Sequence, residues 1–193
     1  AVYTNDPSKL LPRPISICEA DKENGRLRIV YRIAGAGTKE FSAYKEGDTL
    51  DIMGPLGNGF PLKKKKAFLI GGGIGIPPML ELAKNLDCEK TAVIGYRDKE
   101  TFLADELRKY ADVVIATEDG SVGTKGNVID AIRAEKLTAD IIYACGPTPM
   151  LKALKAYAME NGIECYISLE EKMACGIGAC LGCVCHSKDI DEH

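Results

Sequence analysis

The sequence predicts a β plus α/β protein: a partial antiparallel barrel, a doubly wound parallel sheet and a small cysteine-rich segment. Three observations predict this architecture. Residues 1–62 carry short strand patterns between turns, residues 63–167 alternate strand and helix patterns, and residues 168–193 hold four of the eight cysteines. A chain of 193 residues is long enough to bury one large or two small cores.

Composition excludes several functional classes. The formal net charge of −3 leaves no basic excess for nucleic acid, and no apolar run reaches the 18 residues that would indicate a membrane span. The first residues lack a signal-peptide pattern, so we expect a cytoplasmic protein. Because structural disulfides are rare in that compartment, the cysteines indicate metal or redox chemistry.

The first region is predicted to be a small antiparallel barrel or sheet. Residues Leu27–Ile33 alternate apolar and polar side chains, Leu50–Met53 forms another short strand pattern, and nothing is helical over three turns. Lys63–Lys66 follows Pro61 and is interpreted as a solvated linker to the next domain.

The second region alternates strand and helix patterns, which predicts a parallel sheet covered on both faces. The predicted strands are Ala67–Ile70, Thr91–Gly95, Asp112–Ala116, Asp140–Ala144 and Glu164–Ile167. The predicted helices are Pro77–Leu86, Thr101–Tyr110, Asn127–Ala134 and Pro149–Glu160. Such sheets bind ligands beyond the carboxyl ends of their strands.

Two of these strand-end loops are candidate nucleotide sites. One contains Gly71, Gly72, Gly73 and Gly75 between a strand and a helix, where glycines let backbone amides approach a phosphate. Its Gly-x-Gly-x-x-Pro pattern departs from the standard dinucleotide fingerprint, and a tight structural turn is the alternative. The other is Cys145-Gly146, followed by a helix for which Thr148 is the expected N-cap.

The cysteine run has the spacing Cys-x4-Cys-x2-Cys at Cys175, Cys180 and Cys183, which is typical of plant-type [2Fe–2S] ligation. A zinc site would more often show two Cys-x-x-Cys pairs, and a redox thiol switch or inert thiols are the remaining alternatives. Just upstream, Ser168–Glu171 has a capping-box pattern that predicts a short helix.

The two loops, together with Arg13-Pro14-Ile15-Ser16, Tyr31-Arg32, Gly37-Thr38 and residues 54–60, resemble the ferredoxin–NADP reductase superfamily. The resemblance implies that FAD binds to Arg13, Pro14, Ile15, Ser16, Tyr31, Arg32, Gly37 and Thr38. It also implies that Gly71, Gly72, Gly73, Gly75, Cys145 and Gly146 hold the nicotinamide nucleotide, with Cys145 in the nicotinamide pocket.

The nucleotide is expected to be NAD rather than NADP. NADP-using relatives place basic or hydroxyl groups after the third strand of this domain, where this chain has Glu118 and Asp119. Two carboxylates would repel a 2′-phosphate. Arg97, after the second strand, argues in the other direction, and an ordinary acidic turn is the alternative explanation of the pair.

The run from Leu169 to Cys183 further resembles the electron-transfer subunits of class 1B dihydroorotate dehydrogenases, and the resemblance extends over essentially the whole chain. It implies FAD, a [2Fe–2S] cluster and NAD, with electrons passing from an FMN-containing catalytic partner through cluster and flavin to NAD⁺ in pyrimidine biosynthesis. A heterotetramer is expected. No membrane and no nucleic acid are involved.

Two departures from the family pattern carry expectations of their own. Family members begin with additional barrel strands, and their fourth cluster cysteine lies farther along the chain, so we expect that ligand beyond His193, in a longer protein. Cys185 and Cys165 are the fallback ligands. The rival functions are a flavin and iron–sulfur subunit of a hydrogenase or sulfide dehydrogenase complex, and a non-enzymatic zinc or redox-sensing module.

Overall fold

In the computed structural model, which describes residues 1–185, the chain forms two compact units. The first comprises Ala1–Ile15, Arg32–Asn58 and the chain from Glu170 onward. The second comprises Ser16–Tyr31 and Gly59–Leu169. The predicted division into three domains, at residues 62 and 167, stays a prediction.

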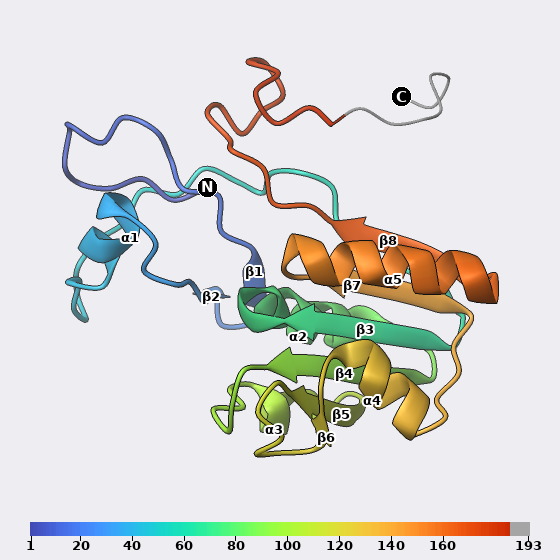
Figure 1. The fold of residues 1–193 in the computed structure, drawn as a ribbon. Helices are drawn as coiled ribbons and strands as arrows, with labels where there is room; N and C mark the ends of the chain where they lie inside the picture. Colours follow the sequence, from blue (N-terminus) through green and yellow to red (C-terminus); the bar gives the residue numbers. More distant parts are fainter. Residues whose placement is uncertain (186–193) are drawn as a thin grey trace. The chain divides into compact units, whose positions relative to one another are not determined.

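The second unit is built on a six-stranded parallel sheet with the order β6-β5-β4-β3-β7-β8 (Figure 1). Its strands are β3 (Ala67–Gly72), β4 (Lys90–Tyr96), β5 (Asp112–Thr117), β6 (Thr124–Lys125), β7 (Ile141–Cys145) and β8 (Glu164–Ser168). The helical elements are η1 (Gly73–Gly75), α2 (Ile76–Asn85), α3 (Ala104–Leu107), α4 (Val128–Ala134) and α5 (Thr148–Asn161).

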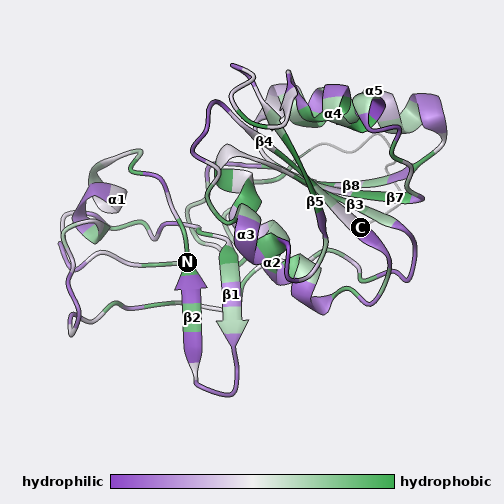
Figure 2. Cartoon of the chain, turned by 90° about the horizontal axis from the view of Figure 1, so that it is seen from below, coloured by the Kyte–Doolittle hydropathy of each residue, from purple (hydrophilic) through white to green (hydrophobic). Residues whose placement is uncertain are grey.

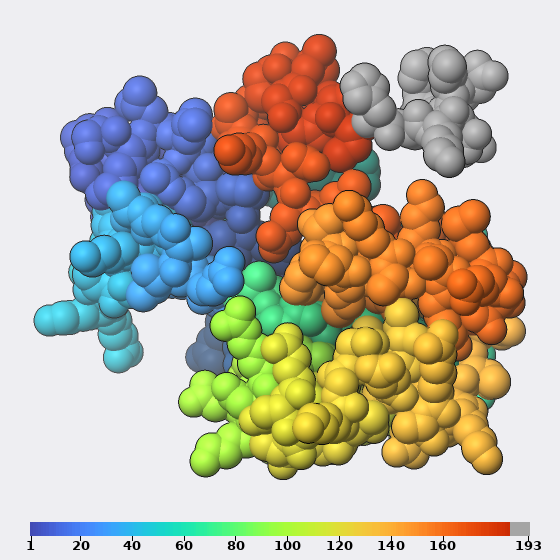
Figure 3. Space-filling model, viewed as in Figure 1, coloured from blue at the N-terminus to red at the C-terminus, as the bar shows by residue number. Residues whose placement is uncertain are grey.

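Successive side chains of the central strand serve opposite cores, which is why its sequence is apolar throughout. Leu69 packs into the cluster formed with α2 and α3, whereas Phe68 and Ile70 pack into the cluster formed with α4 and α5. Figure 2 shows these helix pairs on opposite sides of a sheet whose strands are mostly hydrophobic, and Figure 3 shows α4 and α5 side by side. The predicted doubly wound parallel sheet is therefore confirmed.

A two-stranded antiparallel sheet packs against α2 in the same unit. Its strands are β1 (Ile17–Asp21) and β2 (Arg26–Ile29), and Cys18 is fully buried among the side chains of the α2 cluster. The Ala20 amide donates to Glu81 Oε2 at 3.0 Å, and Lys84 Nζ lies 2.7 Å from Glu19 Oε1. These contacts attach the hairpin to the outer surface of α2.

Several predicted elements differ in extent or do not form. The strand expected at Leu27–Ile33 ends at Ile29, and Leu50–Met53 contributes only an isolated bridge from Ile52 to Val2. The helix expected at Thr101–Tyr110 is limited to Ala104–Leu107, because Leu103 at its N-cap has φ of 64° and interrupts the helical path.

In the first unit, a short helix that the sequence analysis did not predict covers Ala36–Phe41 (α1). It is local in origin. The Thr38 hydroxyl accepts hydrogen bonds from the amides of Ala34 and Gly35 at 2.9 and 3.1 Å, so one side chain satisfies donors at the helix start. A six-residue helix is too short to show the amphipathic repeat on which sequence prediction depends.

The lysine run is held in place by ion pairs. Lys63 and Lys65 both contact Glu164, and the two other lysines reach Asp87 and Glu89. In addition, the buried Tyr143 hydroxyl donates to Pro61 O at 2.7 Å. The connection into β3 is thus attached to both β7 and β8.

Candidate functional site

The two predicted nucleotide loops meet at the carboxyl edge of the parallel sheet. Gly71 of β3 pairs in register with Cys145 of β7. From β3 the chain builds β4 and β5 on one side, then returns to place β7 and β8 on the other. In open α/β sheets such a change of direction marks the crevice beyond the strand ends at which ligands bind.

Backbone contact between these loops is unusually close. A Cβ built on Gly75 would lie 2.1 Å from the carbonyl oxygen of Cys145, although Gly75 itself has ordinary backbone angles (φ −80°, ψ −7°). Its glycine is therefore required by proximity rather than by conformation. Directly after it α2 begins at Ile76, whose amide already donates to the Gly73 carbonyl. Because Pro77 and Pro78 follow and have no N–H, α2 offers an anionic group its positive dipole end rather than free amides.

The six residues predicted to hold the nicotinamide nucleotide are thus brought together: Gly71, Gly72, Gly73, Gly75, Cys145 and Gly146. The Cys145 side chain is 6% exposed and packs in the cluster that includes Ile76 and Tyr143. What the loops present at the crevice is mainly backbone, which suits a phosphate-bearing ligand.

Three of the predicted flavin residues gather in the first unit. A Cβ on Gly37 would lie 2.0 Å from Arg13 Nε, so the guanidinium lies directly against the first turn of α1. Arg13 Nη1 also donates to the Leu11 carbonyl. Thr38 is one residue from this contact, and its hydroxyl is engaged with the backbone of Ala34 and Gly35. A cation and a helix start are therefore adjacent, an arrangement that can receive a pyrophosphate.

The other predicted flavin residues are distributed over both units. Pro14, Ile15 and Arg32 belong to the first unit, whereas Ser16 and Tyr31 belong to the second. Tyr31 is half-buried and Ser16 is exposed. These two residues are where the chain enters and leaves the second unit around the β1–β2 hairpin.

The cysteine segment follows β8 without regular structure as far as Cys185. The short helix expected from Ser168–Glu171 does not form, because Ser168 is the last residue of β8 and pairs with Cys145. Strand pairing across the full length of β8 outweighs the local capping signal. Gly176 and Gly178 have positive φ values of 72° and 78° and fold the segment back on itself.

The thiol of Cys175 lies among backbone amides. The Cys180 amide donates to Cys175 Sγ at 3.4 Å, and hydrogen bonds from the backbone of Cys180 and Ile177 lower the pKa of Cys175 to about 6. Among residues 1–185, no three cysteine, histidine or acidic side chains already form a metal-binding group. The donor chemistry nonetheless fits an iron–sulfur cluster, since amides directed at a cysteine sulfur favour the thiolate that ligates iron.

The fallback ligands have different surroundings. Cys185 Sγ lies 3.7 Å from Glu171 Oε1, and burial together with that carboxylate raises the pKa of Cys185. Cys165 lies in β8 against the α4–α5 cluster, where burial raises its pKa. Both thiols are thus biased toward the protonated form, which binds iron poorly. A fourth ligand beyond His193 falls outside the described residues.

Comparison with known proteins identifies the family. Residues 170–192 match the iron–sulfur cluster binding domain of dihydroorotate dehydrogenase B. The electron transfer subunit of dihydroorotate dehydrogenase B (NAD(+)) from Bacillus caldolyticus is 46% identical over 185 residues, covering 92% of this chain and 71% of that protein. The chain belongs to the family of dihydroorotate dehydrogenase B electron transfer subunits. The corresponding subunit of Fusobacterium nucleatum is 47% identical and is matched over 95% of this chain and 74% of its own length.

Solved structures agree with this assignment. A chain of an NADH-dependent reduced ferredoxin–NADP oxidoreductase superposes with a TM-score of 0.85 at 33% identity, covering 94% of this chain and 68% of that one. A flavohemoglobin from Malassezia yamatoensis superposes with a TM-score of 0.71 at 22% identity, which shows the shared fold alone. The predicted resemblance to dihydroorotate dehydrogenase B electron transfer subunits is therefore confirmed.

The acidic turn Glu118–Asp119, which follows β5, lies next to Arg97, which follows β4. The Asp119 amide donates to the Arg97 carbonyl at 3.2 Å. Ser121 donates twice to Asp119 Oδ1, at 2.7 and 2.9 Å, and these bonds lower the pKa of Asp119. Asp119 thus bonds within its own turn, and Glu118 beside it is exposed.

One residue at the crevice was not among the predicted site residues. Met150, in the first turn of α5, contacts both Gly72 and Gly146. The sequence offered one signal for it, its position four residues after Gly146 at the start of a helix that faces the same sheet edge.

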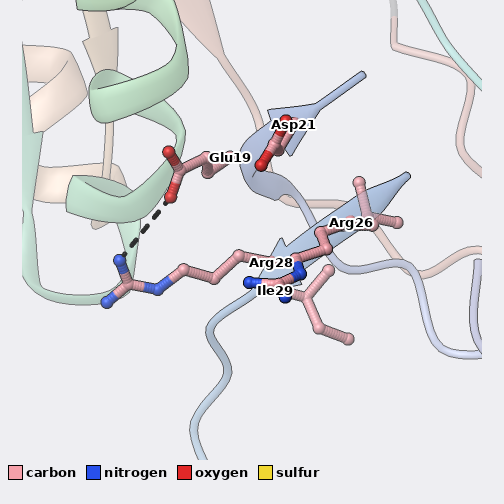
Figure 4. A pocket seen from close by; sticks show the side chains of 6 residues that line it. Glu19, Asp21, Arg26, Arg28 and Ile29 are labelled. Atoms are coloured by element: carbon pink, nitrogen blue, oxygen red, sulfur yellow. Dashed lines mark ion pairs between the residues drawn. The ribbon is translucent and has the colours of Figure 1, made fainter. Parts of the chain in front are cut away.

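A separate hollow lies on the β1–β2 hairpin, where Glu19 and Asp21 face Arg26 and Arg28 (Figure 4). Arg28 Nη1 lies 3.8 Å from Glu19 Oε2 across the two strands, and it also lies 2.5 Å from Glu106 Oε2. Arg28 thus pairs with carboxylates of both the hairpin and α3. None of the described helices is long and apolar enough to cross a membrane.

Proposed function

We propose that this chain is the electron-transfer subunit of a dihydroorotate dehydrogenase of the B type, which passes electrons from an FMN-containing catalytic subunit through a [2Fe–2S] cluster and FAD to NAD⁺. One observation carries the proposal. The chain combines two features. In the Cys-x4-Cys-x2-Cys segment the Cys175 sulfur accepts a hydrogen bond from a backbone amide, and the two nucleotide loops meet at the sheet edge.

The cluster would be held by the thiolates of Cys175, Cys180 and Cys183. When bound, a cluster supplies one-electron transfer and a flavin couples it to hydride exchange with nicotinamide. The amides around Cys175 stabilise its thiolate near neutral pH, so this ligand is available without a separate base.

The nucleotide crevice would work by orientation. The glycine backbone and the positive dipole end of α2 receive the phosphates, while the contact between Gly75 and Cys145 holds the two loops in register. Exposed Glu118 disfavours a 2′-phosphate by like-charge repulsion and thereby favours NAD. Arg13 supplies the positive charge for the flavin pyrophosphate.

The proposed setting is the cytoplasm, in a heterotetramer with the catalytic subunit. Several residues of the first unit expose large apolar side chains, as expected for a chain that works in a complex: Leu10, Leu11, Ile52, Ile177, Leu181 and Val184. We also propose domain boundaries at residues 62 and 167, which separate the flavin, nucleotide and cluster residues.

The cluster assignment is tested by purifying the full chain anaerobically with its catalytic partner. We expect Cys175→Ser to abolish bound iron and the visible absorption of the cluster, and Cys185→Ser to retain both. Equal iron loss in the two variants would contradict the ligand assignment, and a colourless zinc-loaded parent protein would contradict the function.

The partner assignment needs a separate measurement. The complex should reduce NAD⁺ when dihydroorotate is supplied, and the chain alone should not. A native complex that lacks a dihydroorotate-oxidising FMN subunit would instead indicate a reductase of a hydrogenase or sulfide dehydrogenase complex.

A further inference from the structure

Met150 lies against both nucleotide loops. A Cβ built on Gly72 would lie 2.7 Å from Met150 Sδ and 3.0 Å from Pro147 Cδ. A Cβ built on Gly146 would lie 2.6 Å from Met150 Cε. The thioether therefore touches the last residue of β3 and the first residue after β7 at the same time.

The conformation of Gly72 shows why this contact matters. Its φ of −125° and ψ of 122° are ordinary extended values that any residue adopts. Gly146 differs, because its φ of 156° by itself favours glycine. The absence of a side chain at position 72 is thus explained by its neighbours, Met150 and Pro147, and not by the backbone.

Packing against the hydrophobic core fixes the position of Met150. It lies in the first turn of α5 and packs against the α4–α5 cluster that contains Phe68 and Leu151, while part of its side chain remains exposed. Methionine has a flexible, polarisable side chain that fills irregular gaps. A residue that is fixed to the core and in contact with both loops sets the distance between them.

We propose that Met150 is a positioning residue that fixes the backbones of Gly72 and Gly146 relative to one another, and thereby sets the affinity for the nicotinamide nucleotide. The inference rests on the proposed nucleotide function of this crevice. Met150 takes no part in electron transfer; it acts through the two glycines.

The test uses the full chain and two readouts, the dissociation constant for NAD⁺ by titration calorimetry and the melting temperature. We expect Met150→Ala to weaken NAD⁺ binding about tenfold, which corresponds to about 1.4 kcal/mol. Met150→Leu, of similar volume, should restore most of the affinity. Met159→Ala is the matched control, because Met159 is on the same helix but 74% exposed.

A double substitution separates positioning from general loss of packing. Gly72→Ala alone should lower the melting temperature and weaken NAD⁺ binding. When it is combined with Met150→Ala, the new methyl group gains the vacated space, so the two effects should be smaller together than their sum.

If the changes in melting temperature of Gly72→Ala and Met150→Ala were additive, or if Met150→Ala kept the parent affinity for NAD⁺, the inference alone would be overturned. A parent chain that binds no NAD⁺ would overturn the proposed nucleotide function, and the role of Met150 with it. The melting-temperature cycle would still report whether Met150 and Gly72 are coupled.

Discussion

Replacing Gly75 with alanine places a methyl group against the backbone of the neighbouring loop. The new Cβ would lie 2.1 Å from Cys145 O and 2.7 Å from the Gly146 amide nitrogen. Carbon and oxygen approach to about 3.3 Å even in the closest favourable contacts, so the loops must separate by roughly 1 Å. Neither obstructing atom belongs to a side chain that can rotate away.

Two consequences follow from this displacement. Overpacking should destabilise the chain by about 1–3 kcal/mol. A shift of about 1 Å in a nucleotide-positioning loop should also lower the rate of NADH-dependent reduction by roughly 100-fold. Urea unfolding measures the first quantity, and steady-state kinetics of NADH with an artificial acceptor measure the second.

Gly59→Ala is the appropriate control, since Gly59 is exposed and a Cβ there meets nothing within 4 Å. Its stability should remain within about 0.5 kcal/mol of the parent. If Gly75→Ala unfolded at the same urea concentration as Gly59→Ala and kept full activity, the close approach of the two loops would be refuted.

Three further outcomes are expected. Leu154→Ala, at a fully buried position of α5, should cost about 2–5 kcal/mol in urea unfolding, and a cost below 1 kcal/mol would contradict the packing of α5. Tyr143→Phe should cost about 1–2 kcal/mol because the donor to Pro61 is lost, and an unchanged unfolding midpoint would contradict that bond. Hydrogen bonds from Lys63 and Lys65 lower the pKa of Glu164 to about 2. This carboxylate therefore contributes stability above its ordinary pKa and loses it as the pH falls from about 4.5 toward 2. Glu164→Gln should flatten the acid dependence of stability in that window, and an identical profile in parent and variant would argue against the ion pairs.

The parallel sheet and its helices could be predicted from the sequence because each element has a long, periodic local signal. Phe68, Leu69 and Ile70 are apolar in succession because both faces of β3 are covered, and α5 repeats its buried residues at helical spacing. The cysteine spacing was equally local. Boundaries were less accurate where one residue decided them, as Leu103 does at the start of α3.

Only the tertiary structure decided which loops meet. Gly75 and Cys145 are far apart in the sequence. No local pattern indicates that the Cys145 carbonyl oxygen lies where a Cβ of residue 75 would be. The same holds for Met150, whose contacts depend on strand order, and for Ser168, where pairing with β7 replaced a helix that its own neighbours favoured. Sequence patterns report periodicity and residue chemistry within a segment, whereas distances between segments depend on how the whole core packs.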